Sequence, residues 1–141
     1  MDRALNCAVL HIASRIFPTG FDIAMDAPAS FEDLVSHLSR TGRMVVWSGG
    51  PKSLVFEDRE VQYAFRAWHN VCHWRGNLRF TTTGELGTLA MHRRHLIAIY
   101  DDTEQLRRWC AMIEPEIVDT DFGYHIPSIH RPSIAPELRV C

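Results

Sequence analysis

Apolar side chains recur every three or four residues through most of this chain, which is the spacing of one face of an α-helix. The clearest stripe is formed by Val61, Phe65, Trp68 and Cys72. Repeats of this kind predict amphipathic helices near residues 3 to 16, 31 to 40, 59 to 75, 83 to 99 and 103 to 114. We therefore predict a mostly α fold, a helical bundle of about five helices, with a minor β or extended segment near residues 43 to 56.

The length of the chain sets the number of domains. With 141 residues, of which 46% are hydrophobic, one core can bury about two-thirds of the unfolded surface. We expect a single domain over residues 1–141. From about residue 122 the prolines, such as Pro127 and Pro132, indicate an irregular tail laid over the surface, and we expect His125 and His130 of this tail to be surface residues.

Capping residues mark several of the predicted helix ends. Ser30, with Asp33 three positions later, is typical of a helix start. Thr82 and Glu85 form the same capping-box pattern at the next but one helix. Pro115 should kink or end the last helix, because proline lacks the N–H that an interior helical position donates.

Two histidines four residues apart, His69 and His73, point to the same side of the helix predicted near residues 59 to 75. Glu85 and His92 are seven residues apart on the following helix and nearly in register. The linker between the helices is short, which suggests antiparallel neighbours that share one cavity. These four residues predict a site for a divalent transition metal such as zinc, iron or manganese. His95 is rotated from that register by roughly 60° and is less suited to the site than His92.

Each of these residues also has a structural explanation. A buried carboxylate must be paired or coordinated, yet Glu85 lies in a first helical turn, where capping and the helix dipole favour glutamate without any metal. Arg66 or Arg93 could pair with Glu85 instead. An HxxxH pair also arises by chance in a chain with eight histidines, so a purely structural histidine cluster stays open.

The tryptophans and the central cysteine are assigned to packing. We expect Trp47, Trp68, Trp74 and Trp109 in the core, although Trp68 and Trp74 flank the histidines and could wall a planar ligand. Cys72 lies between the histidines in sequence but points to their side, so we interpret it as a packed thiol and not as a nucleophile.

Composition argues against several classes of function. A net charge of −2, from 15 basic and 17 acidic residues, gives no reason for general nucleic-acid binding. No apolar run approaches the ~20 residues of a transmembrane helix, so we expect no membrane insertion. The four cysteines are scattered without a CxxC pair, which indicates a reducing, cytoplasmic setting. The turn Ser48-Gly49-Gly50-Pro51 lacks the lysine and hydroxyl of a phosphate loop.

Three stretches carry a resemblance to a known group of proteins. They are Val45-Val46-Trp47-Ser48-Gly49-Gly50, the AFRAWHxxxHWRG run from Ala64 to Gly76, and Thr83-Gly84-Glu85. Together they resemble an uncharacterised family of small proteins of tailed phages and prophages. That family has an aspartate where this chain has Asn70, and often a glutamine at the place of His92. The resemblance implies a phage-type origin and action in the host cytoplasm, and it implies no substrate.

Three classes of function follow from these features. The first is a small metalloprotein, as a metal-dependent hydrolase of a nucleotide or phosphoester, in which His69, His73 and Glu85 hold the ion and His92 is a fourth ligand or a proton shuttle. The second is a phage-encoded interaction protein that inhibits a host bacterial factor, with a structural histidine cluster. The third is a ligand-binding module around Trp68 and Trp74.

Overall fold

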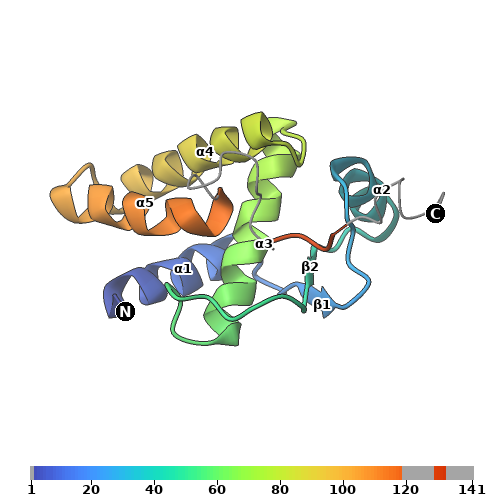
Figure 1. The fold of residues 1–141 in the computed structure, drawn as a ribbon, viewed down its shortest axis with the longest axis horizontal. Coiled ribbons are helices and arrows are strands. Elements are labelled where there is room, and N and C mark those ends of the chain that lie inside the picture. Colours follow the sequence, from blue (N-terminus) through green and yellow to red (C-terminus); the bar gives the residue numbers. More distant parts are fainter. Residues whose placement is uncertain (1, 119–128, 133–141) are drawn as a thin grey trace, which may run out of the picture.

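Helix α3 (Arg59–Gly76) forms the axis of the fold. The structure is a computed structural model, and it describes residues 2–118 and 129–132 (Figure 1). Every residue of α3 from Ala64 to His73 is buried, because other elements cover both of its sides. Polar side chains in this stretch therefore lie away from water, where they need partners within the protein.

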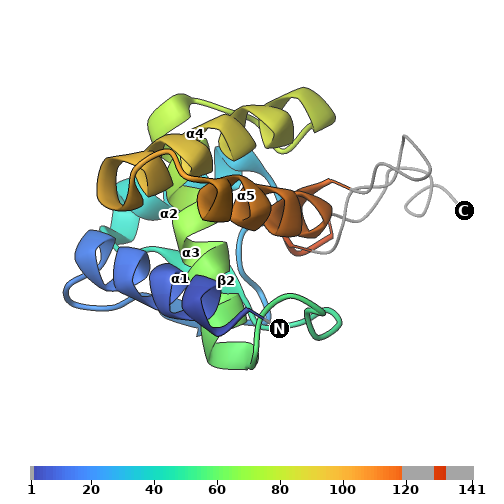
Figure 2. The same cartoon turned by 90° about the vertical axis from the view of Figure 1, so that its left-hand side faces the viewer.

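Three helices pack on one side of α3. They are α1 (Arg3–Ile16), α4 (Thr82–Tyr100) and α5 (Glu104–Ile117) (Figures 1 and 2). Their apolar side chains form one core with the face of α3 that carries Phe65 and Trp68. The fully buried members from these three helices include Leu5, Val9, Leu96, Leu106 and Ile113.

The opposite side of α3 is covered by α2 (Phe31–Thr41) and by two short strands, β1 (Asp22–Ala24) and β2 (Val45–Trp47). The strands are parallel, with Asp22 opposite Val45 and Ala24 opposite Trp47. A second, smaller core lies here, formed by Leu34, Met44, Val46, Ala67 and Val71. Helix α3 thus contributes to both cores, which fixes its position along its whole buried length.

The helix starts follow from local sequence. Ser30, Asp58 and Thr103 adopt extended backbone angles, and each side chain accepts a hydrogen bond from the N–H three residues later. At α4 the cap is Thr81 and not Thr82, since the Thr81 side chain accepts from the N–H of Gly84. The threonine run offers three candidate caps, and the chain uses the first.

The mostly α architecture with five helices is confirmed, and the helix bounds agree with the predicted ranges to within three residues. Strand β1 was not predicted, and Pro115 does not end α5, which continues to Ile117. The expected antiparallel pairing is wrong: α4 crosses α3 and does not run back along it, as both views show.

The remaining expectations about the fold have mixed outcomes. Trp68 and Trp109 are buried as expected, whereas the expectation for Trp74 is wrong, because this residue is 47% exposed. No helix in the described part of the chain is long and apolar enough to cross a bilayer. The proline-containing tail from about residue 122 falls outside the described residues, except for residues 129–132.

Candidate metal centre

Helix α3 supplies two imidazoles, His69 and His73, one helical turn apart. Both side chains are fully buried, and their Nε2 atoms lie 3.0 Å from each other. The Nδ1 atom of His73 donates a hydrogen bond to the carbonyl oxygen of Leu78, at 2.6 Å. A neutral imidazole carries one proton, so this contact leaves the Nε2 of His73 as a bare lone pair that faces His69 and Glu85.

Helix α4 supplies the carboxylate of Glu85 from its first turn. One carboxylate oxygen, Oε2, lies 2.7 Å from Nε2 of His69 and 3.1 Å from Nε2 of His73. The first turn of α4 is pressed against the preceding loop at Gly84, where an added Cβ would lie 1.9 Å from the carbonyl oxygen of Arg79. This close approach holds the start of α4, and with it Glu85, against the end of α3.

A third imidazole, His130, comes from the segment 129–132, far along the chain from α3 and α4. Its Nε2 lies 3.2 Å from Nε2 of His73 and 3.0 Å from Oε1 of Glu85. Its ring stacks on Phe80, with 3.7 Å between the ring centroids. The expectation that His130 is a surface residue is wrong, because its side chain is only 9% exposed. His125 lies outside the described residues.

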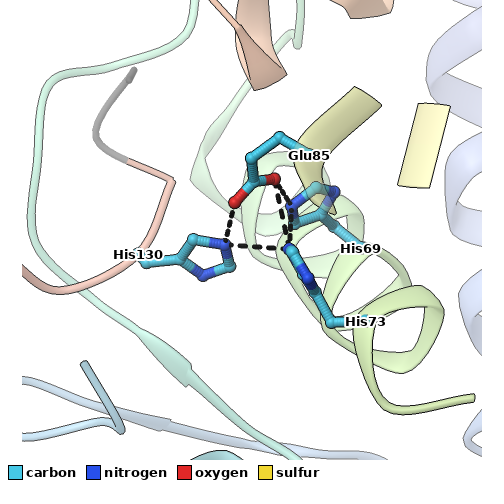
Figure 3. A group of neighbouring side chains, drawn as sticks. All are labelled: His69, His73, Glu85 and His130. Atoms are coloured by element: carbon cyan, nitrogen blue, oxygen red, sulfur yellow. Dashed lines mark hydrogen bonds and ion pairs between the residues drawn. The ribbon is translucent and has the colours of Figure 1, made fainter. Parts of the chain in front are cut away.

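The four side chains point at one another, as Figure 3 shows, and each offers a ligand atom within 4.8 Å of the other three. A tetrahedral ion with bonds of about 2.0 to 2.1 Å holds its ligand atoms about 3.3 Å apart. The measured separations of 3.0 Å between His69 and His73, and of 3.2 Å between His73 and His130, are close to that value. The arrangement therefore fits a small divalent ion.

His92 lies beside this group and not among its four members. The ring is fully buried on α4, and its Nε2 lies 3.1 Å from Nδ1 of His69, the nitrogen that faces away from Glu85. The structure thus brings together three of the four residues predicted from the sequence, His69, His73 and Glu85. It adds His130, and it places His92 one contact further out.

Burial controls the ionisation of these groups. Burial lowers the pKa of His69 to about 4, although the neighbouring Glu85 opposes the shift. Burial also lowers the pKa of His92 and of His130. Burial alone would raise the pKa of Glu85, but the neighbouring His69 and the hydrogen bonds from His130 and His69 hold it below its ordinary value. At neutral pH these shifts favour an ionised Glu85 beside uncharged His69 and His130.

The buried charge of Glu85 has a specific set of partners. Among the described residues, its carboxylate has no arginine or lysine within ion-pair distance, and its side-chain contacts are with His69, His73 and His130. The capping-box explanation is therefore wrong, because the carboxylate turns to the imidazoles. Arg93 lies near Asp102 instead, at 3.8 Å. A divalent cation bound to this carboxylate and the surrounding imidazole nitrogens would neutralise the buried negative charge.

Two neighbours of the centre behave as packing residues. Cys72 is fully buried, and burial raises the pKa of its thiol to about 12, which fits a packed thiol. Asn70 turns to the other side of α3, where its amide donates to the carbonyl oxygen of Val45. Asn70 therefore lies outside the metal centre.

Sequence reasoning missed His130 because nothing in its local pattern marks it as a ligand. The only available signal was the residue type, since residues 127 to 136 contain three prolines and no helical register. Comparison with known proteins adds nothing to the assignment: no family model, no curated protein and no solved structure matches this chain.

Proposed function

We propose that this protein binds one divalent transition metal ion through His69, His73, Glu85 and His130. The observation that carries the proposal is the convergence of four ligand atoms within 4.8 Å, with three of the four side chains fully buried. Three imidazoles and a carboxylate gathered out of water serve no obvious packing purpose, since apolar residues fill such space at lower cost.

Zinc is the metal we propose first. Three nitrogen donors and one oxygen donor suit zinc, which has no geometric preference of its own. The separations of 3.0 Å between His69 and His73 and of 3.2 Å between His73 and His130 are near those that a tetrahedral ion sets. Iron and manganese accept the same donor types but favour more ligands than the four that this group of side chains offers.

For the activity, we propose hydrolysis of a phosphoester, with a nucleotide or another small phosphorylated molecule as substrate. Bound to such a site, the ion would supply a hydroxide at neutral pH by lowering the pKa of a coordinated water. Four protein ligands complete a tetrahedron, so the proposed hydrolysis requires a position for water at the ion, either as a fifth ligand or in place of His130. His130 is the ligand beside which this position would open, because it alone of the four is partly exposed. His69, His73 and Glu85 would hold the ion from the buried side.

A cavity of about 230 Å³ beside the centre supports a small substrate. Its walls include Phe65 and Arg66, which precede His69 on α3, and Ile129, which precedes His130. Arg66 brings a positive charge to the wall of this cavity. None of the four ligands is among the described lining residues, so the proposal requires the Ile129–His130 segment to shift when substrate binds.

We keep the phage-type origin, and action in the host cytoplasm, as parts of this proposal. Their support is the motif run from Ala64 to Gly76, in which His69 and His73 are two of the four proposed ligands. Inhibition of a host factor would be the role to test next if the site binds no metal.

The experiment compares zinc-loaded with metal-free protein against bis(p-nitrophenyl) phosphate, p-nitrophenyl phosphate and the common nucleotides. We expect zinc-dependent turnover of at least one of them, lost in His73→Ala and kept in His11→Ala, which alters an exposed histidine on α1. Stoichiometric zinc binding without turnover of any substrate would overturn the hydrolase proposal and leave a structural zinc site. Failure to bind zinc would overturn both.

A further inference from the structure

Each ring nitrogen of His69 faces a different neighbour. Nε2 lies 2.7 Å from Oε2 of Glu85, inside the metal centre, and Nδ1 lies 3.1 Å from Nε2 of His92, outside it. A neutral imidazole carries its proton on only one of these nitrogens. Coordination through Nε2 therefore requires the proton on Nδ1, and that buried N–H requires an acceptor.

We infer that His92 is a positioning residue for the metal centre, and that its Nε2 accepts the Nδ1 proton of His69 and so holds the Nε2 lone pair of His69 toward the ion. This inference rests on the proposed metal binding and extends it to a residue that is not a ligand. His73 has the equivalent arrangement, with the carbonyl oxygen of Leu78 as acceptor. Outer partners of this kind fix the orientation of ligating imidazoles in metal sites.

The surroundings of His92 hold its ring in place. Phe65 stacks on the ring, with 5.2 Å between centroids, and Trp68 meets it edge-on at 4.3 Å. The ring is also nearly parallel to that of His69, with 14° between their planes. Trp68 is held in turn, because its indole N–H donates to Nδ1 of His95 at 2.8 Å. His92 can therefore present the same nitrogen to His69 without reorientation of the ring.

Cys72 completes the chain of contacts. Its Sγ lies 3.9 Å from Nδ1 of His92, and a thiol is both a weak donor and a weak acceptor. When His69 donates a hydrogen bond from Nδ1 to Nε2 of His92, His92 carries its own proton on Nδ1, toward the sulfur. When His69 instead donates from Nε2 to Glu85, His92 donates from Nε2 to His69 and accepts on Nδ1. Each ring keeps one proton in both arrangements, so the chain accommodates the metal-bound state without a net change of charge.

The test uses two substitutions of His92 and a competition titration of zinc against a chromophoric chelator. His92→Gln keeps a hydrogen-bond acceptor near the place of Nε2, and His92→Met fills similar volume without a strong acceptor. We expect His92→Met to weaken zinc binding by about 10- to 100-fold, and His92→Gln to restore much of the loss. His11→Met, at an exposed position of α1, is the matched control and should bind zinc as the wild type does.

A second measurement covers the case in which a His92 variant fails to fold. Long-range ¹H–¹⁵N spectra of the zinc-loaded wild-type protein report the proton of each imidazole, and we expect His69 to carry it on Nδ1. Wild-type zinc affinity in folded His92→Met, or a proton on Nε2 of His69 in the zinc-loaded protein, would overturn the inference about His92. Absence of zinc binding by the wild type would instead overturn the proposed metal site.

Discussion

Replacing Glu85 with glutamine separates the metal-binding role of this residue from a structural one. The amide has the shape of the carboxylate and can still pair with His69, His73 and His130, but it carries no charge. A ligand present at 1,000 times its Kd stabilises the folded state by about 4 kcal/mol. For a chain of 141 residues each kcal/mol raises the Tm by about 3 °C, so zinc should raise the wild-type Tm by about 12 °C.

In Glu85→Gln we expect the zinc-induced rise in Tm to fall to a few degrees, while the Tm of the metal-free protein changes by no more than about 3 °C. Differential scanning calorimetry with and without zinc measures both quantities. Glu104→Gln is the matched control, because Glu104 is an exposed glutamate in the first turn of α5. A large loss of stability in metal-free Glu85→Gln, with the zinc-induced rise in Tm unchanged, would show that Glu85 is only a structural partner of the histidines and not a metal ligand.

Three further outcomes follow from the structure. Burial lowers the pKa of His69 from 6.5 to about 4, so between these pH values the unfolded chain binds more protons than the folded one. The free energy of unfolding of the metal-free protein should therefore fall by up to about 3 kcal/mol from pH 6.5 to pH 4. Urea titration measures this, and a free energy of unfolding that does not change with pH would contradict it. Gly84→Ala should lower the free energy of unfolding by about 1 to 3 kcal/mol and weaken zinc binding, because the added Cβ would meet the backbone oxygen of Arg79. Unchanged stability would show that the loop at Arg79 moves aside to accommodate the methyl group. In folded protein at pH 8, iodoacetamide should modify the exposed Cys7 and leave the buried Cys72 unmodified. Peptide mass spectrometry measures this labelling, and rapid labelling of Cys72 would disprove its burial.

The helices could be predicted from the sequence because their signals are local. The caps at Ser30 and Asp58 act within three residues, and the apolar periodicity of each helix extends over several turns. Strand β1 could not be predicted in this way, because three residues in extended conformation are defined by pairing with β2 and not by their own composition. The different burial of Trp68 and Trp74 could not be predicted for a similar reason, because it depends on which other elements pack against α3.

Only part of the candidate metal centre could be predicted from the sequence, because only part of it depends on local patterns. His69 and His73 share one helix, so their spacing alone places them on one side of it. Glu85 could be added because a short linker joins its helix to α3. The roles of His92 and His130 depend on how α4 crosses α3 and on where the chain returns after α5, and neither leaves a pattern in the sequence.

The metal content of the purified protein shows whether His69, His73, Glu85 and His130 form a metal site. The measurement is inductively coupled plasma mass spectrometry of protein produced without a histidine tag, loaded with zinc and dialysed against metal-free buffer. We predict about one zinc per chain in the wild type and in His11→Ala, and far less than one in His69→Ala and His130→Ala. Wild-type protein that retains no zinc, or alanine variants that retain as much zinc as the wild type, would show that these residues do not form a metal site.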